Sequence, residues 1–204
     1  MTLPPPPGSA LRNRGPIADV LARVLPAEGL VLEIASGSGA HVTHFAERMP
    51  SLAFQPTEAE AKSLAEIDER ARTRTAGTVL PAIVLDVRAW PWPVARVDAI
   101  VCINMIHASP PETLPALMRG AGALLPPGGR LVTYGPYKIG GAHTSESNVE
   151  FDTWLKTERH PSWGVRDLEA VVAEAEANGL ALDERVTMPA NNFCLVFRRR
   201  AAEA

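Results

Sequence analysis

A glycine turn preceded by an acidic residue is the strongest candidate for chemistry in this sequence, within the run LEIASGSGAH at residues 32–41. Gly37 and Gly39 let the backbone turn sharply and approach a ligand without a Cβ atom in the way. A nicotinamide-binding turn has the pattern G-x-G-x-x-G, but Val42 stands at its third glycine position. Glu33 would repel a pyrophosphate group and suits a cationic ligand such as S-adenosylmethionine (SAM), which carries a sulfonium and an ammonium group. The alternative is a tight strand-to-helix turn with a surface glutamate.

Further candidates follow the other expected strands. Ligands of open α/β sheets bind outside the carboxyl ends of the strands, so the residue after each strand is a candidate contact. Glu58 could accept from ribose hydroxyls, Asp86 from an adenine amino group, and Asn104-Met105 could flank a base or a methionine chain. The simpler explanations are a first-turn helix charge for Glu58, a turn residue for Asp86 and a strand-end cap for Asn104. Because all fall on one edge of the predicted sheet, we interpret them as one site.

The elements that must position these residues alternate between short apolar strands and helices. Strands are predicted at 30–35, 52–54, 79–85, 97–103 and 130–134, and helices at 16–25, 41–49, 58–74, 109–125 and 167–178. Two β-rich runs, 180–188 and 193–199, finish the chain. The alternation implies right-handed crossovers and a mostly parallel sheet with helices on both faces, to which the final pair adds an antiparallel strand. The predicted fold class is therefore α/β, a Rossmann-like doubly wound sheet.

Two segments stand outside this pattern. Pro4 to Pro7 and Gly8 predict a flexible proline-rich arm over residues 1–12, which leaves 13–204 as a single domain. The stretch 135–166 is polar and predicted to be irregular, with at most one short helix around 151–157. It is long for a simple connection, so we interpret it as a lid or an acceptor pocket.

Candidate catalytic residues lie near the same edge. His107 directly follows the fourth strand and could act as a base, or it could be a buried, hydrogen-bonded histidine. Tyr134 and Tyr137 flank the end of the fifth strand, where they could line the acceptor pocket or pack a loop. Asp152 in the long excursion could hydrogen-bond an amine or a carboxylate. The residues alone leave open which of these is catalytic.

Composition restricts the partners. The chain has 204 residues and a formal net charge of −3. This acidic balance gives no long-range attraction to polyanions, so we expect neither nucleic acid nor an anionic membrane as a partner. The longest nearly apolar run, 97–106, is half of the roughly 20 residues that a membrane helix needs. No signal-peptide core is visible at the amino terminus, so we expect a cytoplasmic location.

The cysteines and histidines show no pattern of a metal site, so no metal is expected. Cys102 and Cys194 are expected to be reduced, as is usual in a cytoplasm. In the predicted topology they lie on strands separated by one intervening strand. That places them about 9–10 Å apart, which is beyond disulfide reach.

The chain resembles class I, SAM-dependent methyltransferases in Glu33 to Gly39, Asp86, the PPGGRL turn and the final β-hairpin. More specifically, it resembles the methyltransferase-like 26 (domain of unknown function 938) family from Arg12-Asn13 to Arg199. The blocks that carry this resemblance are LEIASGSGAH, QPTE, CINMIHASP, TYGPY, SNVEFD, WGVRD and MPANNFCLVFRR. Ala35 stands where many methyltransferases have the first glycine, and Glu58 where an aspartate is more usual.

The resemblance implies a seven-stranded sheet and a site for SAM, with S-adenosylhomocysteine (SAH) as its product. The predicted cofactor contacts are Asn13, Glu33, Ala35, Gly37, Gly39, His41, Glu58, Asp86, Val87, Asn104 and Met105. The helix at 16–25, with Arg12-Asn13 before it, is expected to close over the cofactor.

The expected function is methyl transfer by direct displacement to an unidentified small-molecule or protein nucleophile. The alternative is a non-catalytic protein that binds SAM or SAH and serves as a sensor or interaction partner. Such a protein would block the path to the methyl group with His107 or the two tyrosines. A nicotinamide oxidoreductase is a third possibility, disfavoured by Glu33 and Val42. The oligomeric state is left open.

Overall fold

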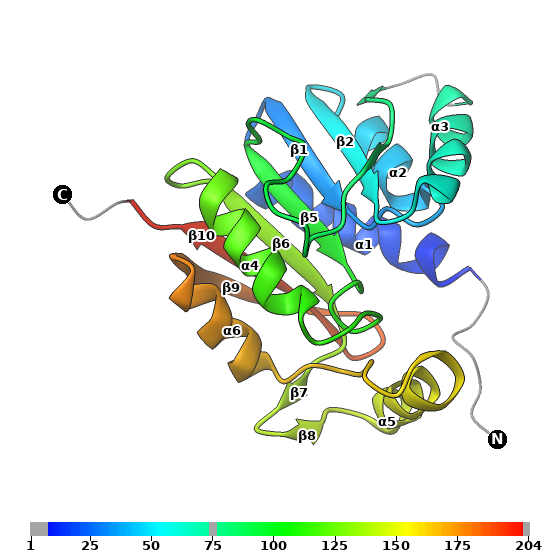
Figure 1. The fold of residues 1–204 in the computed structure, drawn as a ribbon, viewed down its shortest axis with the longest axis vertical. Helices are drawn as coiled ribbons and strands as arrows, with labels where there is room; N and C mark the ends of the chain where they lie inside the picture. The colour runs from blue at the N-terminus through cyan, green and yellow to red at the C-terminus, as the bar shows by residue number, and fades with distance from the viewer. Residues whose placement is uncertain (1–7, 74–76, 202–204) are drawn as a thin grey trace.

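The computed structural model describes residues 8–73 and 77–201, which form a twisted sheet with helices on both faces (Figure 1). The strand order in the sheet is β3-β2-β1-β5-β6-β10-β9, with β4 also paired to β2. The strands are β1 (Gly29–Ile34), β2 (Leu52–Glu58), β3 (Thr78–Val79), β4 (Ile83–Val84), β5 (Ala99–Ile103), β6 (Arg130–Gly135), β9 (Leu180–Met188) and β10 (Asn192–Arg199). All pairings up to β6 are parallel, and β10 is antiparallel to both β6 and β9. The predicted α/β fold with its antiparallel carboxyl-terminal strand is confirmed.

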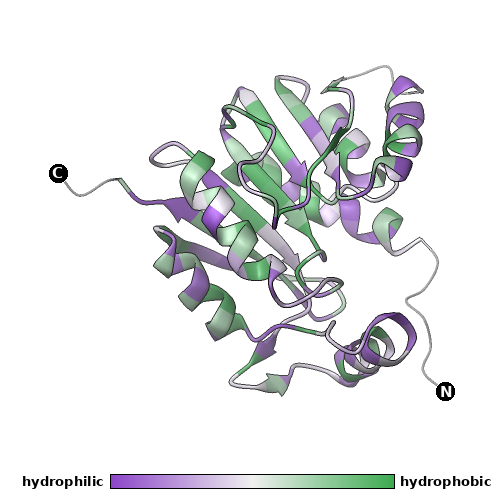
Figure 2. Ribbon diagram, in the orientation of Figure 1, coloured by the Kyte–Doolittle hydropathy of each residue, from purple (hydrophilic) through white to green (hydrophobic). Residues whose placement is uncertain are grey.

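Each face of the sheet has its own hydrophobic core, because successive side chains of a strand point to opposite faces. Val31 of β1 packs with α1 (Ser9–Val24), α2 (Ala40–Arg48) and α3 (Leu64–Arg72). Leu32 of the same strand packs with α4 (Thr113–Leu124) and α6 (Leu168–Ala177). Figure 2 shows the hydrophobic residues concentrated on the central strands, whereas the exposed helix α3 is largely hydrophilic. The central strands are therefore buried on both faces, as parallel strands are.

Helix α1 begins at Ser9, not at Pro16 as predicted, so residues 9–12 belong to a helix and not to a flexible arm. Pro16 lies inside this helix and removes one backbone hydrogen bond. The burial of Ile17 and Leu21 against the sheet holds the helix in spite of that loss. The rest of the predicted arm, residues 1–7, lies outside the described residues.

Strands β2 and β3 also differ from the prediction. β2 runs through Glu58, four residues beyond the predicted end, because Pro56 in its middle hides the strand pattern. The helix predicted from residue 58 starts only at Leu64, after a short 3-10 turn, Ala61–Ser63. The predicted strand 79–85 is split into β3 and β4, with Pro81 between them. Pro81 has no backbone N–H and therefore cannot donate a hydrogen bond to a neighbouring strand.

The excursion between β6 and α6 is ordered rather than irregular. It contains a small hairpin, β7 (Lys138–Ile139) and β8 (Ala142–His143), followed by α5 (Glu146–Trp154) and a π-helical turn (Leu155–Arg159). The prediction of at most one short helix around 151–157 placed helical residues correctly, but it put the start too late and missed the hairpin. The helix begins after Ser145, whose Oγ accepts from the N–H of Asn148 at 3.3 Å and so caps it.

No helix covers the stretch between β4 and β5, where the segment with Trp90, Pro91, Trp92 and Pro93 forms a loop. Trp92 is buried there and fills the space beside Gly120 of α4, where a Cβ atom would collide with the indole ring. Cys102 on β5 and Cys194 on β10 are separated by β6, and both are free and buried, which confirms that they form no disulfide. Among the described residues, none of the helices has the length and apolar character needed to cross a membrane.

Candidate functional site

The carboxyl end of β1 holds a buried carboxyl group. Glu33 is 1% exposed, so the alternative of a surface glutamate is wrong. Its Oε2 has no hydrogen-bond partner among the described residues. Burial raises the pKa of Glu33 to about 8, and the nearby charge of Glu58 adds to the effect, while a hydrogen bond with Ser36 opposes it. A buried, unpaired carboxyl group is costly for a folded chain, and such groups concentrate at functional sites.

The turn after β1 has the backbone geometry of a ligand-binding loop. Ala35, Gly37 and Gly39 all adopt left-handed conformations, with φ of 56°, 59° and 75°. The N–H of Gly37 donates to Oε1 of Glu58 at 2.6 Å, which joins the ends of β1 and β2. A Cβ atom on Gly37 would meet nothing within 4 Å, whereas one on Gly39 would lie 3.2 Å from the backbone of Ile67 in α3. Gly39 is therefore needed for packing, and the space above Gly37 is open.

Three of the predicted residues meet where α1 crosses the sheet edge. Oδ1 of Asn13 on α1 lies 2.8 Å from Nε2 of His41, in the first turn of α2. The side chain of Asn13 also hydrogen-bonds Tyr134 at the end of β6, and burial raises the pKa of that tyrosine. Burial lowers the pKa of His41 to about 4, so this cluster is neutral at pH 7. The amino-terminal part of α1 thus closes one side of the site.

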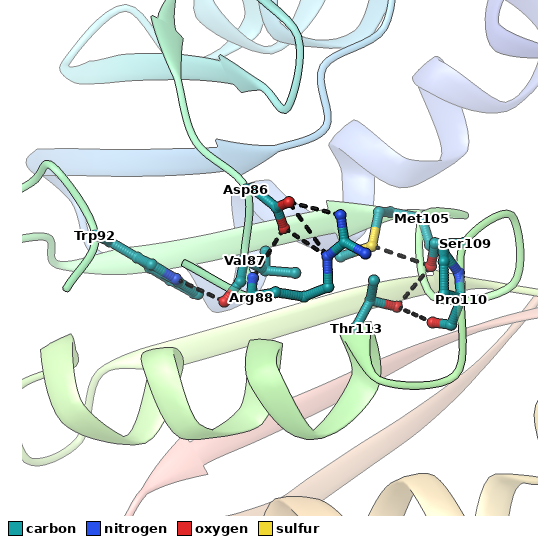
Figure 3. Close-up of polar contacts among 8 residues, drawn as sticks. All are labelled: Asp86, Val87, Arg88, Trp92, Met105, Ser109, Pro110 and Thr113. Carbon is teal, nitrogen blue, oxygen red and sulfur yellow. Dashed lines mark hydrogen bonds and ion pairs between the residues drawn. The ribbon is translucent and has the colours of Figure 1, made fainter. Parts of the chain in front are cut away.

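Figure 3 shows two further segments beside the predicted cofactor residues, the turn after β4 and the loop after β5, which we call the first and the second wall of the site. On the first wall, Nε1 of Trp92 donates to the carbonyl of Val87 at 3.0 Å and anchors the turn that carries Asp86. The Asp86 carboxylate is bound by Arg88, and this hydrogen-bonded ion pair lowers the pKa of Asp86. Sequence reasoning missed Arg88, although an arginine two residues from a predicted ligand-binding aspartate is a recognisable signal.

The second wall is the loop after β5. Asn104 ends the strand in a left-handed conformation, with φ of 60°, and its N–H donates to the carbonyl of Tyr134. The hydroxyl of Ser109 lies 2.5 Å from the Met105 carbonyl, 3.4 Å from its Sδ and 2.6 Å from the hydroxyl of Thr113. These contacts fix the Met105 side chain beside the turn that carries Asp86 (Figure 3).

His107 is fully buried, in agreement with the simpler of its two interpretations. Its Nδ1 accepts from the N–H of Arg166 at 3.2 Å, so the neutral ring carries its proton on Nε2. Burial lowers the pKa of His107 to about 3, and the charge of Arg166 lowers it further. With one nitrogen accepting and the other protonated, the ring has no free lone pair with which to act as a base. Nε2 faces Gly135, where a Cβ atom would collide with it.

Tyr137 also has a packing role in this structure. Its ring meets His107 edge to face at 4.9 Å between centroids, and its hydroxyl lies 2.8 Å from Oγ1 of Thr133. The side chain is fully buried, and burial raises its pKa. Neither the ring nor the hydroxyl faces an open crevice.

Asp152 joins the parts of the excursion instead of facing the cofactor residues. Its Oδ2 lies 2.6 Å from Nζ of Lys156, 3.2 Å from Nε2 of His143 and 3.6 Å from Nζ of Lys138, and its Oδ1 accepts from the N–H of Val165 at 2.7 Å. Burial raises the pKa of Asp152, but these partners outweigh it and the net pKa is below the usual range. The carboxylate is thus already bound by groups of the chain itself.

A strap of residues 164–166 connects this cluster to the loop after β5. The N–H of Gly164 donates to the His107 carbonyl at 3.0 Å. The guanidinium group of Arg166 donates to the carbonyls of Ile106 at 2.8 Å and Ser109 at 2.7 Å. Asn148 of α5 donates to the carbonyl of Asn191 in the β9–β10 turn at 3.0 Å. The excursion is therefore tied to the sheet edge at two places.

An Asp152→Asn variant is expected to loosen this excursion. The asparagine amide could still accept a hydrogen bond from the N–H of Val165. Lys138, His143 and Lys156 would lose the negative charge of Asp152. We therefore expect the free energy of unfolding to fall by about 2–3 kcal/mol. Amide hydrogen exchange over residues 138–166 should become faster. Asp19→Asn is the control, because Asp19 forms an ion pair with Arg48 while its side chain is 66% exposed. Equal exchange in the wild type and the Asp152 variant would show that Asp152 does not hold the excursion.

The predicted residues thus fall into two groups. The cofactor candidates line the carboxyl ends of the strands, from Asn13 on α1 to Met105 after β5. Of the catalytic candidates, Tyr134 lies at this edge, His107 and Tyr137 are buried against each other, and Asp152 lies within the excursion.

Comparisons with known proteins agree with the fold described above. A family model described as "Protein of unknown function (DUF938)" matches residues 6–199. The O-methyltransferase family 2 protein from Planctomyces limnophilus, in complex with apigenin, is 21% identical with a TM-score of 0.74, covering 94% of this chain and 58% of that one. A methyltransferase of calicheamicin biosynthesis, in its SAH-bound form, is 20% identical with a TM-score of 0.72, covering 95% and 54%.

A candidate methyltransferase from Bacillus halodurans is 13% identical with a TM-score of 0.73, and the match covers 93% of this chain and 100% of that one. The chain therefore spans just over half of the first two proteins and the whole length of the third. At these identities the likeness shows a shared fold.

Proposed function

The chain belongs to the DUF938 family, a family of unknown function, and because it has the fold of SAM-dependent methyltransferases we propose that it transfers a methyl group from SAM to a small-molecule or protein nucleophile. Fold alone does not imply function, so the proposal depends on the chemistry of the site.

The observation that carries the proposal is the buried carboxyl group of Glu33 with its unpartnered Oε2. A cation placed beside it would stabilise the ionised form and supply the missing partner. The ammonium group of SAM or SAH has this chemistry, whereas the pyrophosphate of a nicotinamide cofactor would be repelled. The residues present therefore fit SAM.

The other residues of the edge fit the rest of the same molecule. We assign the ribose hydroxyls to Oε2 of Glu58, because Oε1 accepts from Gly37. We assign the adenine amino group to Asp86 and a ring nitrogen to the N–H of Val87, with Met105 beside the base. The open space above Gly37 lets the ligand approach the backbone. Asn13, His41 and Tyr134 exclude water from one side of this site.

When bound, SAM supplies an electrophilic methyl group on a sulfonium centre, so the protein has to position a nucleophile in line with it. Because Nδ1 of His107 accepts from the N–H of Arg166, the neutral ring carries its proton on Nε2 and cannot accept another there. The hydroxyl of Tyr137 is buried against Thr133. This arrangement favours an acceptor atom that already has a free lone pair at neutral pH.

One observation favours the non-catalytic alternative. The strap of residues 164–166 covers His107 and is hydrogen-bonded to the loop after β5, so it would have to open for an acceptor that approaches over His107. A protein that binds SAM without transferring its methyl group would keep the strap closed.

We expect calorimetry to detect micromolar binding of SAM and SAH and no binding of NADH. Absence of SAM and SAH binding in a folded sample would refute the cofactor assignment. Incubation of the protein with methyl-labelled SAM and a cell extract then separates the two alternatives. Transfer of label supports the methyltransferase, and tight binding with no transfer under any condition supports the non-catalytic protein.

A further inference from the structure

The carboxylate that we assign to the adenine amino group is already bound by an arginine of the same turn. Nη2 of Arg88 lies 2.7 Å from Oδ2 of Asp86, and Nε lies 3.0 Å from Oδ1 and 3.2 Å from Oδ2. The backbone N–H of Arg88 adds a fourth contact, to Oδ1, at 2.9 Å. A guanidinium group in this two-pronged arrangement occupies the outer lone pairs of both carboxylate oxygens.

The position of Arg88 makes this pair relevant to the ligand. In Figure 3 the guanidinium group lies between the turn at Asp86 and the loop with Met105 and Ser109, the two walls assigned to the base. The walls themselves are anchored, one by Trp92 and the other by Ser109 and Thr113. The side chain of Arg88 is 52% exposed, and its hydrogen bonds to described residues are made by the guanidinium group, so it is the part that can move.

We propose that Arg88 competes with the adenine of the cofactor: its guanidinium group occupies the Asp86 carboxylate and must swing away before the adenine amino group binds there. This inference rests on the proposed function, because it presupposes an adenine at Asp86. Arg88 is thus a regulatory residue of the site, which lowers the affinity for the cofactor without touching it.

The expected size of the effect follows from the exposure of the pair. Half-exposed ion pairs contribute little, and opening one lowers a binding constant about 1.5- to 5-fold. Salt screens such a pair, so the competition should weaken as ionic strength rises.

The test is calorimetric titration with SAH of the wild type, Arg88→Gln and Arg96→Gln. Arg96 is a matched control, because it is exposed and pairs with Asp98 at the opposite, amino end of β5. We expect Arg88→Gln to bind SAH about 1.5- to 5-fold more tightly than the wild type in 50 mM salt and equally in 500 mM salt. Arg96→Gln should behave as the wild type.

A second ligand tests the site of competition. S-inosylhomocysteine carries a carbonyl where SAH carries the amino group, and a carbonyl can accept from Arg88 while the ion pair stays closed. The preference for SAH over this analogue should therefore be greater in Arg88→Gln than in the wild type. Equal preference in both proteins would contradict competition at Asp86.

The two proposals can fail separately. If SAH binds the wild type but Arg88→Gln binds it equally or more weakly in 50 mM salt, the competition is refuted and the cofactor assignment stands. If none of the three proteins binds SAH while their unfolding transitions are normal, the cofactor assignment is refuted, and the role of Arg88 with it.

Discussion

A Glu33→Gln variant is expected to be more stable than the wild type at pH 8 and to differ from it by less than about 1 kcal/mol at pH 5. The folded-state pKa of Glu33, about 8, lies above the ordinary value of 4.5. Between pH 4.5 and about 8 the folded state therefore binds a proton that the unfolded chain does not. The contribution of Glu33 to the free energy of unfolding of the wild type is therefore highest below pH 4.5 and is lost as the pH rises to about 8. The loss is on the order of 3 kcal/mol by pH 7. Glutamine has no proton to lose, so the variant escapes this decline.

Urea unfolding of both proteins at pH 5, 6, 7 and 8 measures this difference. Glu66→Gln on α3 is the control, because its carboxylate is 63% exposed and pairs only loosely, at 3.5 Å, with Arg70. Parallel stability curves for the wild type and Glu33→Gln would show that Glu33 does not titrate in this range.

The same variant is expected to bind SAH at least tenfold more weakly, since a hydrogen bond between charged groups is worth about 1.5–3 kcal/mol. A cation beside Glu33 lowers its pKa in the complex, so binding releases a proton and wild-type affinity should rise from pH 6 to pH 8. The affinity of Glu33→Gln should show no such rise. A variant that gained stability but kept full affinity would separate Glu33 from the ligand and remove the main support for the proposed function.

Gly37→Val is expected to abolish SAH binding while leaving the protein folded. The left-handed backbone at Gly37 costs a β-branched residue about 1–2 kcal/mol, which a domain of this size tolerates. The added side chain meets no described atom at its Cβ, so it extends into the open space assigned to the ligand. Calorimetry should detect no binding at SAH concentrations 100-fold above the wild-type Kd.

Gly128→Val is a matched control for this variant. Gly128 has a φ of 82° and also has nothing within 4 Å of a Cβ position, but it lies before β6, at the amino end of the sheet. It should lose similar stability and keep full affinity. If Gly37→Val failed to fold and Gly128→Val folded, the glycine at 37 would be structural and its functional assignment would be wrong.

Local patterns predicted most of the fold. The alternation of apolar strands with helices implied the parallel sheet, and the final β-rich pair implied its antiparallel end, because both depend on periodicity within short segments. In α1 and the sheet the errors occurred where a proline masked the local pattern: Pro16 inside α1, Pro56 inside β2 and Pro81 between β3 and β4. Contacts distant in the sequence outweigh the local cost of these prolines.

The sequence by itself determined the edge of the sheet at which the candidate site lies. Strand polarity brings Glu33, Glu58 and Asp86 to one edge, and the glycine turn needs only its own backbone to adopt its conformation. Only the tertiary structure decided the state of each group: that Glu33 is buried without a partner, that Arg88 occupies Asp86, and that Arg166 fixes the proton of His107 on Nε2. Burial and hydrogen-bond partners set a group's charge and proton position. Some of these partners are remote in the chain, as the sequence separation of 59 between His107 and Arg166 illustrates.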